Sequence, residues 1–226
     1  RTHSESFTIT VTDNEDPTIV GLPANISVNN DAGVCGATVS WPAPTAADNC
    51  PGSTIAQTLG AASGTVFPIG TTTITYTATD AASRTHSESF TITVTDNEDP
   101  TLTAIADRNE NVGASCNFTI PNYRGLTAAS DNCTAVGSIV KTQTPAIGTV
   151  ISGHNNTQLI TITANDGNGN TNTTTFTITL KDVTKPVITC PAPVSANTNS
   201  DGLGNCTTKV SLGSPTATDN CTTAGS

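Results

Sequence analysis

The first seventeen residues of the chain recur unchanged further along it. The segment RTHSESFTITVTDNEDP occupies residues 1–17 and again residues 84–100. A perfect copy at a fixed displacement indicates tandem modules. The copied segment contains an alternating strand, Ser6–Thr12, followed at once by an acidic cluster and a proline, Asp13–Pro17. This order predicts the end of one β-domain and the start of the next.

Two further markers recur with a similar period. The acidic linker at Asp13–Pro17 is repeated at Asp96–Pro100 and, in a weaker form, at Asp182–Pro186, while the tripeptide Asp-Asn-Cys begins at Asp48, Asp131 and Asp219. Both ends of the sequence fall inside a module, so we interpret it as a section of a longer protein. The expected divisions are the last strand of a preceding module (1–13), two whole modules (14–97 and 98–183) and the first half of a third (184–226).

The composition favours an acidic β-protein. Aromatic residues make up only 4% of the chain, and 18 acidic side chains face 8 basic ones, for a net charge of −10. Abundant Thr, Val and Ile favour strands. The acidic balance argues against nucleic acid as a partner, because phosphate binding needs a basic face. We expect cations as partners instead, and no membrane insertion in this section, which has no long apolar run.

The pattern of alternation predicts short strands and no helix. In the first module we expect strands within 17–28, 34–41, 54–59, 65–68, 71–79 and 88–95, with 42–49 as a loop; in the second, 157–163 and 174–180 are the last two. Strands of this length and spacing indicate an all-β fold of tandem, immunoglobulin-like Greek-key β-sandwiches in an elongated array. Trp41 and the equivalent residues Phe7, Phe90 and Phe176 are expected in the cores.

Seven cysteines suggest an oxidising, extracellular location. Three pairs recur in place, and we expect each to form a disulfide inside its own module; reduced or metal-bound thiols are the alternative. The pairs are Cys35 with Cys50, Cys116 with Cys133, and Cys206 with Cys221. Cys190 is left over, and we expect its partner in the last strand of its own module, beyond Ser226.

Several motifs resemble the hyalin repeat (HYR) family, an immunoglobulin-like extracellular module. The resemblance runs through both whole modules and into the third. It rests on Asp13–Ile19, Pro23–Val28, Asp48–Cys50, Val66–Gly70, Thr71–Asp80 and Ser89–Val94. The second module departs from it by lacking the Phe-Pro turn of Val66–Gly70. The resemblance implies a role in cell-surface adhesion or protein interaction, in long arrays similar to those of giant secreted bacterial surface adhesins.

The acidic residues are expected to meet at the N-terminal end of each module. In a seven-strand sandwich the first strand leaves that end and the second returns to it, so the linker, the Asp-Asn-Cys loop and the turn before the last strand converge there. Converging carboxylates repel unless they are neutralised, and numerous oxygen ligands suit Ca²⁺. The predicted sets are Asp13, Glu15, Asp16, Asp48, Asn49 and Asp80, then Asp96, Glu98, Asp99, Asp131, Asn132 and Asp166.

The predicted calcium sites are similar to the interdomain sites of cadherins, which stiffen tandem domains. A solvated acidic linker that keeps the chain soluble is the alternative. At the Asp182 junction Val183 and Thr184 replace two polar residues of the linker and Lys185 adds a positive charge, so a weaker or absent site is expected there.

One expectation conflicts with another. Cys35 begins the second strand and Cys50 adjoins the loop after it, yet a disulfide needs Cα atoms within about 7 Å. Six strand residues span roughly 20 Å. Either the second strand is short or the segment 42–47 doubles back, and full doubling back would move Asp48 away from the acidic set.

These features predict a structural or adhesive extracellular array, made rigid by disulfides and calcium and acting as a surface filament or stalk. Its partners are expected to be neighbouring modules of the same chain, with lateral self-association or cell-surface ligands as further possibilities. The alternative is that the modules are spacers or ligand-binding units of a larger secreted enzyme. Within this section His3, His86 and His154 have no recognisable nucleophile beside them, so we expect no enzyme activity.

Overall fold

A computed structural model describes residues 1–198, 206 and 208–221 of the chain, so the expected half-module 184–226 is covered in part. The chain divides into two compact units. Unit 1 contains 1–101, 129–140 and 164–172, and unit 2 contains 102–128, 141–163 and 173–226. Two loops of the second module therefore belong to the same compact unit as the first module.

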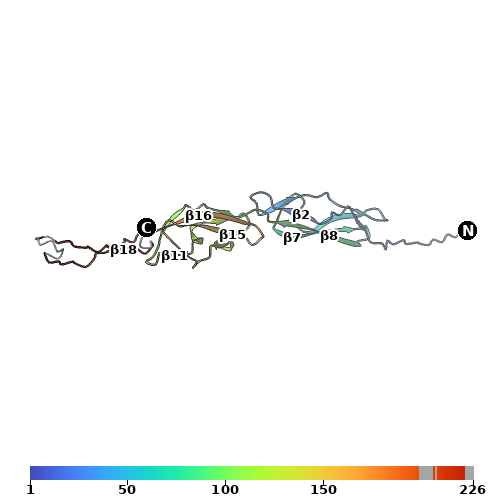
Figure 1. The fold of residues 1–226 in the computed structure, drawn as a ribbon. Helices are drawn as coiled ribbons and strands as arrows, with labels where there is room; N and C mark the ends of the chain where they lie inside the picture. Colours follow the sequence, from blue (N-terminus) through green and yellow to red (C-terminus); the bar gives the residue numbers. More distant parts are fainter. Residues whose placement is uncertain (199–205, 207, 222–226) are drawn as a thin grey trace. The chain divides into compact units, whose positions relative to one another are not determined.

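The first module contains a four-stranded sheet. Its strand order is β2 (Ile26–Asn29), β8 (Thr85–Thr95), β7 (Gly70–Thr79) and β5 (Thr54–Leu59). The long strands β7 and β8 pair in antiparallel register along their whole length, and β2 runs parallel to β8 on its other side (Figure 1). The Thr-rich alternation of β7 and β8 fits this position, because every second side chain is buried in the core.

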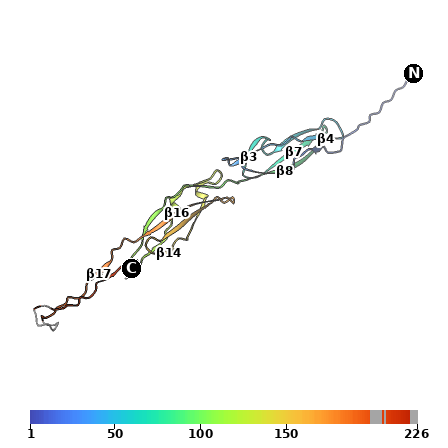
Figure 2. The same cartoon turned by 45° about the horizontal axis from the view of Figure 1, so that its top comes forward.

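Two short pairs complete the first module: β1 (Thr18–Val20) with β4 (Thr45–Ala47), and β3 (Gly36–Val39) with β6 (Thr65–Pro68). Figure 2 labels one strand of each pair, β4 and β3. The expected first strand is thus two strands that join different partners. The chain changes direction between them at Gly21, whose φ of +78° favours glycine. The segment that was expected to be only a loop contains β4.

Side chains from both groups of strands form the core of the first module. Trp41 lies 5.4 Å from Phe90 and 5.8 Å from Phe67, measured between ring centroids. Its indole N–H donates a hydrogen bond of 3.0 Å to the Tyr76 hydroxyl, so the one polar atom of the buried indole has a partner. Ile74 and Ile92 are fully buried beside these rings.

The second module repeats this plan. Its four-stranded sheet has the order β10 (Arg108–Asn111), β16 (Thr171–Lys181), β15 (Thr157–Asn165) and β13 (Val140–Thr144), with β10 parallel to β16. Tyr123 and Phe176 pack edge to face at 5.2 Å in its core. The short pairs are β9 (Thr101–Leu102) with β12 (Ala129–Ser130), β11 (Asn117–Thr119) with β14 (Val150–Ser152), and, in the next module, β17 (Val187–Thr189) with β18 (Thr216–Thr218).

The expected all-β fold with two β-sandwich modules is confirmed. Within the described residues the only helical segments are the 3-10 turns η1 (Arg124–Leu126) and η2 (Val136–Ser138). No helix among those residues is long and apolar enough to cross a bilayer.

The assignment of Ser6–Thr12 to the last strand of a preceding module, with Phe7 in its core, remains a prediction. Residues 1–12 form no strand, and Phe7 is 87% exposed, whereas its copy Phe90 is 2% exposed. The two segments have the same sequence, so local propensity does not decide between these states. β8 is a strand because β7 and β2 pair with its two edges.

Identical sequences in different environments allow a matched test of the core. We expect Phe90→Ala to reduce the free energy of unfolding by about 3–5 kcal/mol, the usual cost of removing a buried phenyl ring. Phe7→Ala, in the same local sequence, should leave it unchanged. Chemical denaturation of both variants measures this, and an equal effect of the two substitutions would contradict the assigned core.

Candidate metal centre

Three aspartates converge within unit 1. Asp96 follows β8, Asp131 follows β12 and Asp166 follows β15, and one carboxylate oxygen from each lies within 4.8 Å of the other two. Asp96 is 3% exposed and Asp166 is 4% exposed, while Asp131 is half-buried. Three residues from distant parts of the sequence therefore place carboxylates in one largely buried position.

Loop hydrogen bonds hold two of these carboxylates in place. Oδ1 of Asp131 accepts the backbone N–H groups of Cys133 at 2.8 Å and Thr134 at 2.7 Å. Oδ1 of Asp166 accepts the N–H groups of Asn168, Gly169 and Asn170 at 2.8, 3.2 and 3.0 Å. Each aspartate thus fixes the loop that carries it and is fixed in return.

Asp166 is an anion at neutral pH despite its burial. Burial raises its pKa, but the hydrogen bond from the Asn170 side chain and those from the backbone of the turn outweigh that effect and lower the pKa below its usual value. The turn is built for this arrangement, since Gly167 and Gly169 adopt φ of +89° and +114° and direct successive N–H groups toward the carboxylate.

The remaining oxygens of the triad are incompletely paired. Oδ2 of Asp96 accepts the Asn168 side-chain amide at 2.9 Å, but Oδ2 of Asp131 is buried without a hydrogen-bond partner. Among the described residues no Lys, Arg or His forms an ion pair with any of the three. Clustered buried carboxylates without a counter-charge are costly, and an all-oxygen donor set suits a hard cation.

A second copy of the arrangement lies at the start of the first module. Ligand atoms of Asp13, Asp48 and Cys50 lie within 4.8 Å of one another. Asp80, the counterpart of Asp166, is 6% exposed, and Oδ2 atoms of Asp13, Asp48 and Asp80 are all buried without a partner. A hydrogen bond to Asp13, followed by burial and the charges of all three aspartates, raises the pKa of the Cys50 thiol.

The other predicted ligands are exposed or form hydrogen bonds or ion pairs with other residues. Glu15, Asn49 and Asp99 are exposed. Asp16 forms a salt bridge of 2.8 Å with Arg84. Oε1 of Glu98 accepts the Asn30 side-chain amide at 2.9 Å and the Gly33 N–H at 2.6 Å, and Asn132 donates to the Val34 carbonyl at 3.3 Å. The structure thus brings together one aspartate from each of three segments, Asp96, Asp131 and Asp166, and the other predicted ligands remain a prediction.

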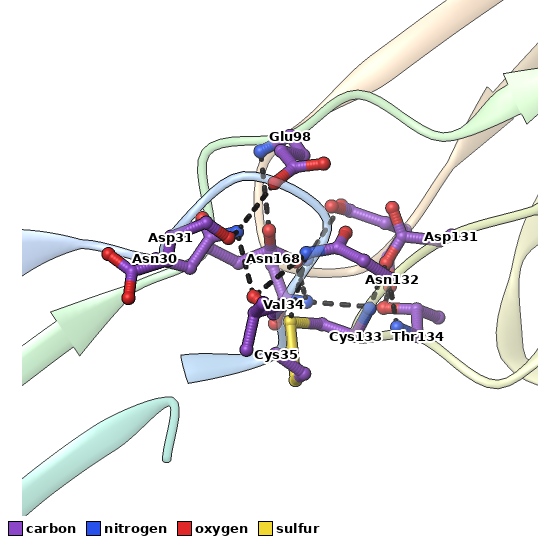
Figure 3. The surroundings of a disulfide bond; sticks show 12 residues. Asn30, Asp31, Val34, Cys35, Glu98, Asp131, Asn132, Cys133, Thr134 and Asn168 are labelled. Atoms are coloured by element: carbon purple, nitrogen blue, oxygen red, sulfur yellow. Dashed lines mark hydrogen bonds between the residues drawn. A yellow bond between two sulfur atoms is a disulfide. The ribbon is translucent and has the colours of Figure 1, made fainter. Parts of the chain in front are cut away.

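The predicted disulfide pairing within modules was wrong. Cys35 is bonded to Cys133, with Cα atoms 4.7 Å apart, and Cys116 is bonded to Cys221, with Cα atoms 4.9 Å apart (Figure 3 shows the first). Cys50 and Cys206, which were expected to pair with Cys35 and Cys221, have free thiols, as does Cys190. Each bond joins the turn before the second strand of one module to the Asp-Asn-Cys loop of the next.

The physical reason for this pairing is the direction of β3, which corresponds to the expected second strand. Cys35 precedes β3, which runs toward the end of the module that carries Asp48 and Cys50. The strand separates the two cysteines by more than a disulfide can span. Cys35 instead lies beside residues 131–134, and Asp48 stays in the acidic cluster because no doubling back is needed.

Each residue of the Asp-Asn-Cys motif makes a different contact, and the copies at 131–133 and 219–221 make the same contacts. The aspartate accepts the N–H of its own cysteine, at 2.8 Å in Asp131 and 3.0 Å in Asp219. The asparagine donates to a carbonyl in the turn before the second strand of the preceding module: Asn132 to Val34 at 3.3 Å and Asn220 to Gly113 at 3.1 Å. The cysteine forms the disulfide with that turn.

Sequence reasoning missed Asn30, Asn168, Asn170 and Thr134. Thr134 donates to the Asp166 carbonyl at 2.9 Å, and Asn168 and Asn170 donate to Asp96 and Asp166. The alternating Asp-Gly-Asn-Gly-Asn of 166–170 was the available signal, because such a turn directs N–H groups and amides toward one point. Asn30, only 8% exposed, gave no local signal.

The third junction lies in unit 2, and its linker, Asp182–Pro186, has fewer acidic residues than the other two linkers. Asp182 and Asp219 line a pocket with His154 and Pro186. The N–H of Thr184 is the main cause that lowers the pKa of Asp182, with burial opposing it and Asp219 and Asn220 adding to it. Oδ1 of Asp182 accepts that N–H at 2.9 Å. The predicted weakness of this site remains a prediction.

Comparison with known proteins identifies part of the chain directly. Residues 12–94 match the HYR domain. The chain contains a HYR domain. A curated relative, Hyalin from Lytechinus variegatus, is 33% identical over 224 residues, which is 97% of this chain and 41% of that protein. The chain therefore spans less than half the length of this relative.

Solved structures with tandem cadherin domains show similarity at low identity. Human CDH23 EC21-23 covers 92% of this chain and 81% of its own, with 16% identity and a TM-score of 0.38. Mouse cadherin-23 EC22-24 covers 77% and 69%, with 14% identity and a TM-score of 0.37. Human mucin-like protocadherin EC1-2 covers 75% and 100%, with 10% identity and a TM-score of 0.38.

The disulfide assignment gives a direct prediction. Peptide mapping without reduction should recover Cys35 linked to Cys133 and Cys116 linked to Cys221. Cys133→Ser should expose Cys35 as a free thiol in mass spectrometry after alkylation, whereas Cys50→Ser should leave Cys35 protected. A Cys35–Cys50 peptide in the unmodified chain would contradict the assignment.

Proposed function

We propose that this chain is a section of an extracellular structural or adhesive array, in which each joint between HYR modules is held by a disulfide and by a bound Ca²⁺. The role of the array is mechanical: it projects or strengthens a surface attachment. The ion and the disulfide limit movement at the joint, so that modules behave as a continuous stalk. The presence of a HYR domain and the similarity to Hyalin support the extracellular assignment.

The buried Oδ2 of Asp131 is the observation that carries this proposal. A carboxylate oxygen without a donor, next to two buried carboxylates, is destabilising unless a cation lies among them. Asp96, Asp131 and Asp166 would hold the ion, and it would supply the positive charge that the side chains around it lack. Calcium accepts six to eight oxygens with flexible geometry, so carbonyls or water complete the set.

The position of the triad supports a role at the joint. Asp96 belongs to the linker after β8, while Asp131 and Asp166 belong to loops of the following module. A cation bound to all three therefore connects segments that are far apart in the sequence. Cys133 lies two residues from Asp131 and bonds Cys35, so the covalent and ionic connections share one loop. Long-lived disulfides also suit an oxidising, extracellular environment.

Calcium binding should depend on Asp131. We expect millimolar Ca²⁺ to raise the thermal midpoint of the chain and EGTA to reverse the change, because a ligand that binds only the folded state stabilises it. Asp131→Asn keeps the acceptor for Cys133 and Thr134 but removes the charge, and it should weaken calcium affinity by about tenfold or more in titration calorimetry, a change of about 1.4 kcal/mol.

Asp107→Asn is the matched control. Asp107 is also an acidic residue that accepts a backbone N–H, from Thr177, but it lies outside the triad. It should bind calcium as the unmodified chain does. Small-angle scattering with calcium and with chelator tests the mechanical role. An unchanged maximum dimension together with an unchanged thermal midpoint would refute calcium stiffening.

A further inference from the structure

Two positively charged side chains of the second module line one pocket. Arg124, in the 3-10 turn η1, and Lys141, in strand β13, form this pocket together with Asn122 and Gly125. Its volume is about 300 Å³. All four residues belong to unit 2, and none of them belongs to the aspartate clusters described above. The pocket therefore concentrates positive charge in a chain whose net charge is −10.

Hydrogen bonds to uncharged oxygens hold both cations in place. The backbone N–H and the Nε–H of Arg124 both donate to Oδ1 of Asn122 at 3.1 Å. Nη1 of Arg124 donates to the Lys141 carbonyl at 3.3 Å, and Nζ of Lys141 donates to the Thr127 carbonyl at 2.7 Å. The turn and the strand thus fix each other. Side chains that are already positioned lose less freedom when a ligand binds, so the pocket is preorganised.

Neither cation has an acidic partner among the described residues. Arg84 and Arg108 each form a salt bridge with a carboxylate. Arg124 and Lys141 are half-buried, and their side chains donate only to uncharged oxygens. Two like charges on the wall of one pocket repel each other, and an anion that contacts both removes that repulsion. Each side chain also retains N–H groups that no atom of the described chain accepts.

We propose that this pocket binds an acidic sugar, whose carboxylate or sulfate group is held by Arg124 and Lys141. The remaining N–H groups of the guanidinium can donate to two oxygens of such a group, and the Lys141 ammonium adds a compact positive charge. The inference goes beyond the mechanical role proposed above and does not depend on it, because no residue of the pocket takes part in the calcium triad or the disulfides.

The size and the lining of the pocket favour a single sugar unit. A volume of about 300 Å³ is at the lower end of the range for small-molecule sites. The lining contains no apolar side chain that could anchor a peptide, whereas the Asn122 amide nitrogen has no partner in the described part of the chain and can donate to a sugar hydroxyl. A long polyanion is repelled by the net charge of −10. One acidic unit of an otherwise neutral glycan meets all these conditions.

Titration of the full chain with single sugars tests the site. Glucuronic acid supplies a carboxylate, a sulfated glucose supplies a sulfate, and glucose is their neutral counterpart. In NMR spectra at least one acidic sugar should shift the side-chain signals of Arg124 and Lys141, and glucose should not. Lys141→Gln should weaken the binding by about tenfold or more, a change of about 1.4 kcal/mol. Lys181→Gln is the matched control, because Lys181 is also half-buried and donates to a neutral oxygen, of Asn155 at 2.8 Å, but lies outside the pocket. It should bind as the unmodified chain does.

A second variant separates the shape of the pocket from its charge. Gly125→Leu keeps both cations, and a Cβ at Gly125 would meet no atom within 4 Å, so the chain should fold with an unchanged thermal midpoint while the new side chain fills the pocket and abolishes binding. Three results would overturn the proposal: neither acidic sugar binds, acetate or inorganic sulfate binds as well as the sugars do, or the acidic dipeptide Gly-Glu binds more tightly than both. Since every titration is repeated in calcium and in EGTA, failure of this site is distinguishable from failure of the calcium proposal.

Discussion

The contact between the turn at Asn30–Cys35 and the loop at Asp131–Cys133 is the interaction on which the joint depends. Three neighbouring side chains perform three different tasks there: a carboxylate in the acidic triad, an amide hydrogen bond to a backbone carbonyl, and a covalent bond. Because they lie on one short loop, a displacement of the loop affects all three contacts. In the chain-entropy model a disulfide closing a loop of about 100 residues also destabilises the unfolded state by about 4–5 kcal/mol.

The two observed joints differ in sequence at two pairs of equivalent positions. Asn30 and Val112 occupy equivalent places, since each N–H donates to the carbonyl that ends the last strand of its module. Buried Asn30 has Glu98 as its partner, whereas the residue equivalent to Glu98 at the next joint is Thr184, and Val112 is buried with Leu180 and Cys116. At the second joint Val112 stands in place of Asn30 and Thr184 in place of Glu98. Because the asparagine and its carboxylate partner are both absent there, no amide at the position of Asn30 is left buried without a hydrogen-bond partner.

The repeats and alternation predicted the strands and the convergence of the aspartates, because both follow from local pattern and chain direction. They did not predict partners. Cysteines that recur together within each module suggested bonds inside the module, although a bond from each module to the next gives the same recurrence. Only the distance that β3 places between Cys35 and Cys50 distinguishes these pairings, and that distance depends on the tertiary structure. Sequence position also did not give the partners of two predicted ligands: Glu98 accepts a hydrogen bond from the Asn30 amide, and Asp16 forms an ion pair with Arg84.

The order of the disulfides has a consequence for a chain under tension. The bridged segments 35–133 and 116–221 overlap, since Cys116 precedes Cys133. Force applied to the two ends passes from Cys35 to Cys133, back along the backbone to Cys116, and across to Cys221. Residues 36–115 and 134–220 lie outside this shortest covalent path and cannot be drawn out to full length while the bonds hold. The extensible length is thereby set by the placement of four cysteines rather than by the strength of either β-sandwich.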